Sequence, residues 1–74
     1  MPPIPILRPK DVIYAFEKLG WAVARQKGSH IIMTKKGQIA TLSIPNHPEV
    51  ARGTLRDLIK RSGESVDEFL SYIS

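Results

Sequence analysis

The apolar residues of this chain change their spacing twice along its length, and this change restricts the possible fold more than any other feature. From Pro9 to Gly20 they recur every three or four residues, which is the spacing of one buried helix face. From Trp21 to Ile44 short segments rich in β-branched and aromatic residues follow, which favour strands. Helical spacing returns from Thr54 onward. The pattern predicts an α+β fold.

The boundaries of the first helix and of the strands follow from local signals. Proline is favoured at a first helical position and glycine just after the last one, so the first helix is expected between Pro9 and Gly20. Three antiparallel strands are expected over residues 21–26, 30–34 and 38–44, because the links between them are short. Pro45 is expected to break the third strand, since proline cannot donate a hydrogen bond to the sheet.

Two capping boxes predict where the remaining helices begin. Thr54 pairs with Asp57, and Ser65 pairs with Glu68, in each case three residues apart. Gly63 is placed to end the first of these two helices. The predicted order is therefore α-β-β-β-α with a short C-terminal helix around a three-stranded antiparallel sheet. Double-stranded-RNA-binding domains share this order, which alone does not identify a function.

A chain of 74 residues holds one domain. Residues 1–8 contain three prolines and predict an extended leader, laid across the domain by Ile4, Ile6 and Leu7, and residues 9–74 are expected to form the single domain. The sequence has no cysteine, which excludes disulfides and thiolate zinc sites. It shows neither a signal-peptide pattern nor an apolar run long enough to span a membrane, so a cytoplasmic protein with no membrane partner is expected.

The net charge of +4 favours polyanionic partners such as nucleic acids. Metal chemistry is not expected, because the two histidines, His30 and His47, and the acidic residues show no spacing typical of a shared metal site. No cofactor is expected either. A serine–histidine–acid arrangement is disfavoured because Ser29 adjoins His30, and adjacent strand residues point to opposite faces.

RNA cleavage demands less of a protein, because the 2′-hydroxyl of the substrate is the nucleophile and one acid–base group can be enough. His30 suits this role because it begins a strand directly after Gly28 and Ser29, where the backbone can approach a phosphate. Arg25 and Lys27 precede it and could bind phosphate. The alternative is that His30 is simply a polar residue at a strand end.

Other basic and polar residues have two interpretations each. His47 is either a loop residue that spaces a turn between two prolines or a second proton donor. Arg52, Arg56 and Lys60 follow at four-residue steps and form either a solvated helix face or a basic ridge that binds RNA phosphates.

Two aromatic residues could stack on RNA bases. Trp21 is expected in the core instead, because it follows the end of the first helix and opens a strand. Tyr14 lies off the apolar face of that helix and is expected at its rim.

Three segments together resemble the HicA toxins of bacterial and archaeal HicA–HicB toxin–antitoxin pairs. Phe16–Trp21 resembles the leucine-glycine-aromatic junction of that family, Gly28-Ser29-His30 its glycine-serine-histidine signature, and Gly53–Arg56 with Ile59 and Gly63 its closing helix. The segments come in the family's order and spacing. Pro45–Pro48 resembles the family's proline-and-histidine loop, but no catalytic role is transferred to His47.

The resemblance implies a double-stranded-RNA-binding-like fold and a metal-independent endoribonuclease that cleaves messenger RNA. It assigns the catalytic histidine to His30 and implies a HicB-type antitoxin that covers the active surface. We expect the free toxin to be a monomer. Two other functions fit the same residues, namely a non-catalytic RNA-binding module and an adaptor whose basic face binds an acidic protein.

Overall fold

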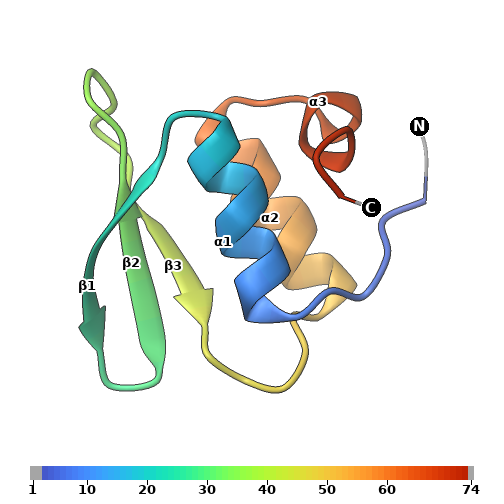
Figure 1. The fold of residues 1–74 in the computed structure, drawn as a ribbon, viewed down its shortest axis with the longest axis horizontal. Coiled ribbons are helices and arrows are strands. Elements are labelled where there is room, and N and C mark those ends of the chain that lie inside the picture. The colour runs from blue at the N-terminus through green and yellow to red at the C-terminus, as the bar shows by residue number, and fades with distance from the viewer. Residues whose placement is uncertain (1–2, 74) are drawn as a thin grey trace.

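The computed structural model describes residues 3–73, which form three helices and three strands in the order α-β-β-β-α-α (Figure 1). The predicted α+β fold is confirmed. The elements are α1 (Pro9–Lys18), β1 (Ala22–Lys27), β2 (His30–Thr34), β3 (Leu42–Pro45), α2 (Arg52–Ser62) and α3 (Val66–Leu70). Within the described residues, no helix has the length and apolar character needed to cross a membrane.

The first helix, α1, has the predicted boundaries. Pro9 occupies its first turn, and the chain leaves the helix after Leu19, where Gly20 adopts a φ of 99°. Val12 and Phe16 are fully buried one turn apart. The apolar spacing thus builds one buried face, and a glycine ends the helix in a conformation that other residues rarely adopt.

The sheet is antiparallel with the order β1-β2-β3, and the helices lie on one side of it (Figure 1). Both α1 and α2 contact β3. Met33, Leu42 and Ile44 are fully buried between the sheet and the helices. Side chains alternate between the two faces of a sheet, so the residues next to these three along the strands point away from the helices. No helix or strand in residues 3–73 covers that second face (Figure 1).

The third strand is shorter than predicted. The expected strand covers residues 38–44, but β3 begins only at Leu42, opposite Met33. The Gln38 backbone N–H donates to the Lys35 carbonyl at 3.0 Å and closes a turn, and residues 39–41 after it do not pair with β2. Ile39 is fully exposed in this connection. Pro45, expected to break the strand, is its last residue, which an edge strand tolerates.

The prediction that Thr54 and Asp57 cap a helix is wrong. The helix α2 begins at Arg52, and its N-cap residue, Ala51, has no side-chain hydrogen bond. Thr54 is already the third residue of the helix. The preceding strand-like residue Val50 donates its backbone N–H to the Leu7 carbonyl at 2.7 Å, so a long-range contact, instead of a local cap, fixes where the chain enters α2.

The end of α2 and the start of α3 agree with the sequence. Gly63 ends α2 with a φ of 80°, and the Ser65 hydroxyl accepts a hydrogen bond from the Glu68 backbone N–H at 3.0 Å. Phe69 of α3 is fully buried, and its ring centroid lies 4.9 Å from that of Phe16. The short C-terminal helix therefore closes the core against α1.

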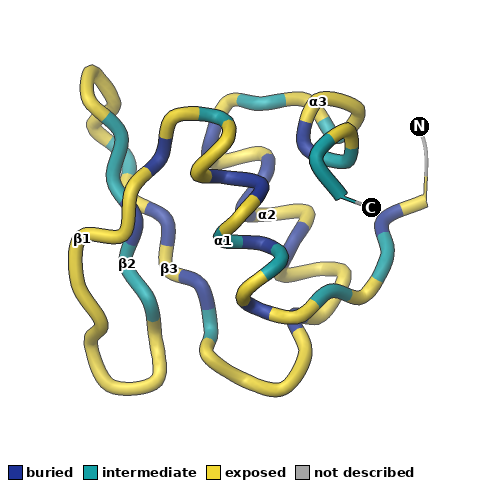
Figure 2. Tube along the Cα trace, in the orientation of Figure 1, coloured by how far each residue is buried: buried dark blue, intermediate teal, exposed yellow. Residues whose placement is uncertain are grey.

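The N-terminal segment packs on the domain through two of its three apolar residues. Ile4 is buried and Leu7 packs on the core, whereas Ile6 is exposed. The Arg52 Nε donates to the Ile4 carbonyl at 2.9 Å. Figure 2 shows this segment running beside the start of α2, with a buried position near the N-terminal end of the segment. Met1 and Pro2 of the predicted leader lie outside the described residues.

Candidate functional site: the open face of the sheet

Strand pairing gathers three of the predicted residues on the side of the sheet that faces away from the helices. His30 lies opposite Lys27 on one side and Pro45 on the other, and Arg25 lies opposite Ile32, which lies opposite Ser43. Directly opposed residues share a face, and residues two apart along a strand share it too. We call this surface the open face: Arg25, Lys27, His30, Ile32, Ser43 and Pro45.

His30 is exposed at one end of the open face, as are Arg25 and Lys27. In the part of the chain that the structure describes, the only ion pair joins Lys35 to Glu64 at 3.3 Å. The cations beside His30 therefore have no carboxylate partner. The cations can bind a phosphate group, and the exposed imidazole beside them can transfer a proton to or from the bound molecule.

Gly28 and Ser29 form the turn that joins β1 to β2. Gly28 adopts a φ of 59°, and a Cβ atom at this position would meet nothing within 4 Å. The backbone here is open to an approaching ligand. The glycine of the glycine-serine-histidine signature thus has a conformational reason, because L residues with side chains rarely adopt this φ.

His47 comes to the same end of the sheet, which the sequence did not predict. The Asn46 backbone N–H donates to the Ser29 carbonyl at 2.7 Å, and this bond continues the pairing of His30 with Pro45. The loop after β3 therefore lies against the turn before β2, with exposed His47 next in the chain. The pairing is non-local, so chain spacing carries no signal of it.

The predicted basic ridge, Arg52, Arg56 and Lys60, lies on α2 and is exposed, and Lys60 lies beside Asp57 and Arg61. Arg52 contacts Ile4, and Arg56, one turn later, shares that flank of the helix. A different flank of α2 faces β3. Its cation is Arg61, which the sequence analysis did not single out, although it adjoins Lys60 and a helical projection places it on another flank.

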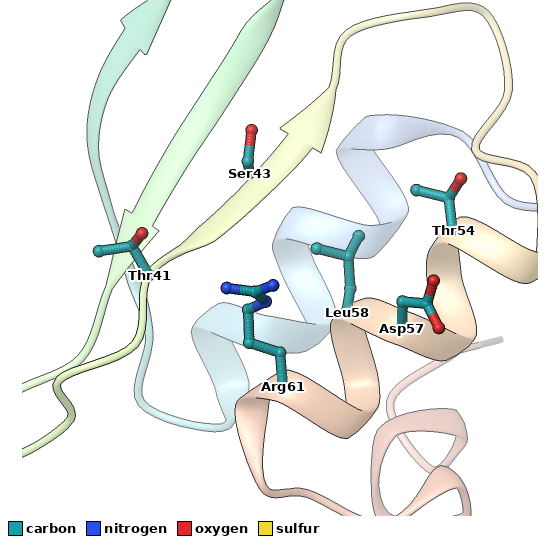
Figure 3. Close-up of a pocket in the computed structure, with 6 residues that line it drawn as sticks. All are labelled: Thr41, Ser43, Thr54, Asp57, Leu58 and Arg61. Carbon is teal, nitrogen blue, oxygen red and sulfur yellow. The ribbon is translucent and has the colours of Figure 1, made fainter.

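Arg61 lines a hollow of about 320 Å³ between β3 and α2. Figure 3 shows its side chain extending from α2 toward β3. The hollow is formed by Thr41, Ser43, Thr54, Asp57, Leu58 and Arg61. Because Ser43 also belongs to the open face, the hollow adjoins the surface that carries His30.

The two aromatic residues lie where they were expected. Trp21 is buried, with 2% of its surface exposed, and packs edge-on against Phe16. Tyr14 is half exposed, with the Lys18 Nζ 5.4 Å from its ring centroid. Neither is on the open face. Among residues 3–73, no group of three or more histidine, cysteine, aspartate or glutamate side chains is placed to hold a metal ion.

The fold and the site together define a class of protein: a small, basic α+β domain whose uncovered sheet face carries a histidine among cations. Residues 9–64 of the 74-residue chain match the sequence model of the family described as the HicA toxin of bacterial toxin-antitoxin. The chain therefore belongs to the HicA toxin family, as its three motifs suggested. It is a toxin of a toxin–antitoxin system, and membership of the family implies an antitoxin partner.

No curated protein and no solved structure matches the chain. The matched region ends at Glu64, so α3 and the N-terminal segment lie outside it.

Proposed function

We propose that this toxin is a metal-independent endoribonuclease that cleaves messenger RNA on the open face of its sheet, with His30 as the acid–base group. The observation that carries the proposal is the pairing of exposed His30 with Lys27, with Arg25 further along the same face. All three side chains are exposed and can contact the ribose and phosphate of a bound RNA.

The reaction needs groups of the RNA, His30 on the open face and a second group that donates a proton. The 2′-oxygen attacks the adjacent phosphorus while the His30 imidazole takes its proton. The bond from phosphorus to the 5′-oxygen breaks, and that oxygen takes a proton from the second group, giving a 2′,3′-cyclic phosphate and a 5′-hydroxyl. Lys27 and Arg25 stabilise the additional negative charge on the phosphate oxygens in the transition state.

His47 is the candidate for the second proton-transfer group. Its loop is bonded to the Ser29 carbonyl, next to His30, so both imidazoles belong to one end of the sheet. A histidine that gives a proton to the 5′-oxygen while another takes one from the 2′-oxygen completes the reaction in one step. General acid and base groups each contribute about 10²- to 10⁴-fold.

We assign binding of the rest of the RNA to the backbone of one turn and to the basic residues of α2. The Gly28–Ser29 turn allows close approach of a phosphate, and Arg52, Arg56 and Lys60 hold phosphates farther from the cleaved bond. The antitoxin is proposed to be of the HicB type and to cover the open face. We propose that the free toxin acts as a monomer in the cytoplasm, where its substrate is.

Substitution of the proposed catalytic residue tests the function. His30→Ala is expected to lower the rate of RNA cleavage in excess chelator by at least about 100-fold, and to leave the fold intact because His30 is exposed. The rate is measured with labelled RNA, and folding by circular dichroism. Undiminished cleavage by this variant would reject the assignment of His30.

The same experiment separates the two remaining functions. Intact RNA with native protein, together with binding that weakens steeply as salt rises, would favour a non-catalytic RNA-binding module that uses the same basic face. Negligible binding of RNA would favour the adaptor.

A further inference from the structure

The hollow between β3 and α2 has polar side chains with no protein partner. In residues 3–73, no side-chain hydrogen bond or ion pair is made by a side chain that lines the hollow. Asp57 and Arg61 are therefore not joined to each other. Aspartate and arginine one turn apart commonly pair on a helix. Here the carboxylate and the guanidinium both remain available to a ligand (Figure 3).

Asp57 is the only acidic residue of α2, a helix that carries four basic residues. On a surface that attracts phosphates, a carboxylate repels the backbone of RNA. Within the described residues it forms no ion pair with a neighbouring cation. A carboxylate can, however, accept hydrogen bonds from the amino and imino groups of an RNA base.

The hollow adjoins the proposed cleavage site. Ser43 lies at its edge and is two residues from Pro45, which pairs with His30. Two residues along a strand span about 7 Å. A nucleotide next to the one whose phosphate lies at His30 is therefore within reach of the hollow.

We propose that the hollow binds the base of an unpaired nucleotide and prefers guanine. This inference deepens the proposed function, on which it rests. Guanine presents two adjacent donors, which suit the two oxygens of one carboxylate, and two acceptors, which suit the guanidinium. Asp57 accepts from the imino and amino groups, Arg61 donates to the other edge, and the hydroxyls of Thr41, Ser43 and Thr54 complete the site. Unpaired bases are read along these edges in proteins that bind single-stranded RNA.

Binding of mononucleotides tests the site without cleavage. Guanosine monophosphate, titrated into the isotope-labelled native protein, is expected to shift the backbone amide signals of residues that line the hollow. It should bind at least about tenfold more tightly than the adenosine, cytidine and uridine monophosphates. All four ligands carry the same phosphate, so the difference reports the base. Equal affinities, or shifts confined to residues near His30, would overturn the proposal.

Asp57→Asn is expected to remove the preference for guanine. The asparagine amide has one oxygen that accepts and one NH₂ group that donates, whereas the imino and amino groups of guanine need two acceptors. The ratio of affinities for guanosine and adenosine monophosphates is expected to fall at least about tenfold. The matched control is Asp67→Asn, an exposed acid on α3 that makes the same change in charge away from the hollow. An equal loss in both variants would show a general charge effect and would contradict the site.

Cleavage assays distinguish this inference from the function on which it rests. With oligonucleotides that contain one guanine or one adenine at a set position, Asp57→Asn is expected to reduce the ratio of their cleavage rates. If His30→Ala abolishes cleavage and Asp57→Asn leaves this ratio unchanged, the base site is wrong and the nuclease stands. If His30→Ala cleaves normally, the assignment of His30 is wrong, and the mononucleotide titration still decides the base site.

Discussion

At the residue scale, the site depends on the side of the sheet to which each side chain points. His30 and Lys27 face away from the helices, while the next residue, Ile31, is partly buried against the core. A shift of one residue in the pairing would turn His30 toward the helices. The burial of Met33 and Ile44 therefore holds the histidine in place, because their removal from the core would be costly.

The contribution of the cation beside His30 is tested by Lys27→Ala. We expect the rate of RNA cleavage to fall about 10- to 150-fold, because a hydrogen bond between charged groups contributes about 1.5–3 kcal/mol and each 1.4 kcal/mol is tenfold. The control is Lys10→Ala, which removes the same charge from an exposed position on α1. If both variants lose the same activity, net charge and not the open face would explain the effect.

At the scale of elements, the loop after β3 brings the second histidine to the end of the sheet that carries the first. If His47 gives the proton to the leaving 5′-oxygen, His47→Ala should lower the rate of RNA cleavage at least about 100-fold. The rate is measured with labelled RNA. A rate equal to that of the native protein would exclude His47 as the donor.

The start of α3 shows what one local hydrogen bond contributes. The Ser65 hydroxyl caps this helix at the Glu68 N–H, so Ser65→Ala should lower the free energy of unfolding by about 1 kcal/mol. Urea denaturation measures the change. Thr54→Ala serves as the comparison, because Thr54 lies inside α2 and caps nothing. A larger loss from the Thr54 variant would contradict the cap assignment.

At the scale of the whole molecule, the short C-terminal helix contributes a side chain to the core even though it lies outside the region matched by the family. Phe69 is fully buried against Phe16. Phe69→Ala should lower the free energy of unfolding by about 3–5 kcal/mol, which is a large part of the stability of a domain of this size. Phe69→Leu should lose much less, because it keeps most of the buried volume.

The change is measured by urea denaturation, followed through the fluorescence of buried Trp21. Similar stability of the alanine variant and the native protein would show that α3 does not close the core.

The sequence by itself determined the class of fold, the boundaries of α1, the end of α2 and the identity of His30 as the candidate catalytic residue. Those features depend on local properties, namely the spacing of apolar residues, the conformations open to proline and glycine, and short motifs. The sequence also predicted that Arg25, Lys27 and His30 belong together, since a two-residue turn leaves few ways to pair the strands that it joins.

The tertiary structure alone decided where the elements begin when distant contacts hold them. The entry into α2 follows from the bond between Val50 and Leu7. It likewise placed the loop that carries His47 against the turn at Ser29 and turned Arg61, with Asp57, toward β3. Each of these outcomes joins residues far apart in the chain, and their approach depends on how the helices pack on the sheet, which no local pattern encodes.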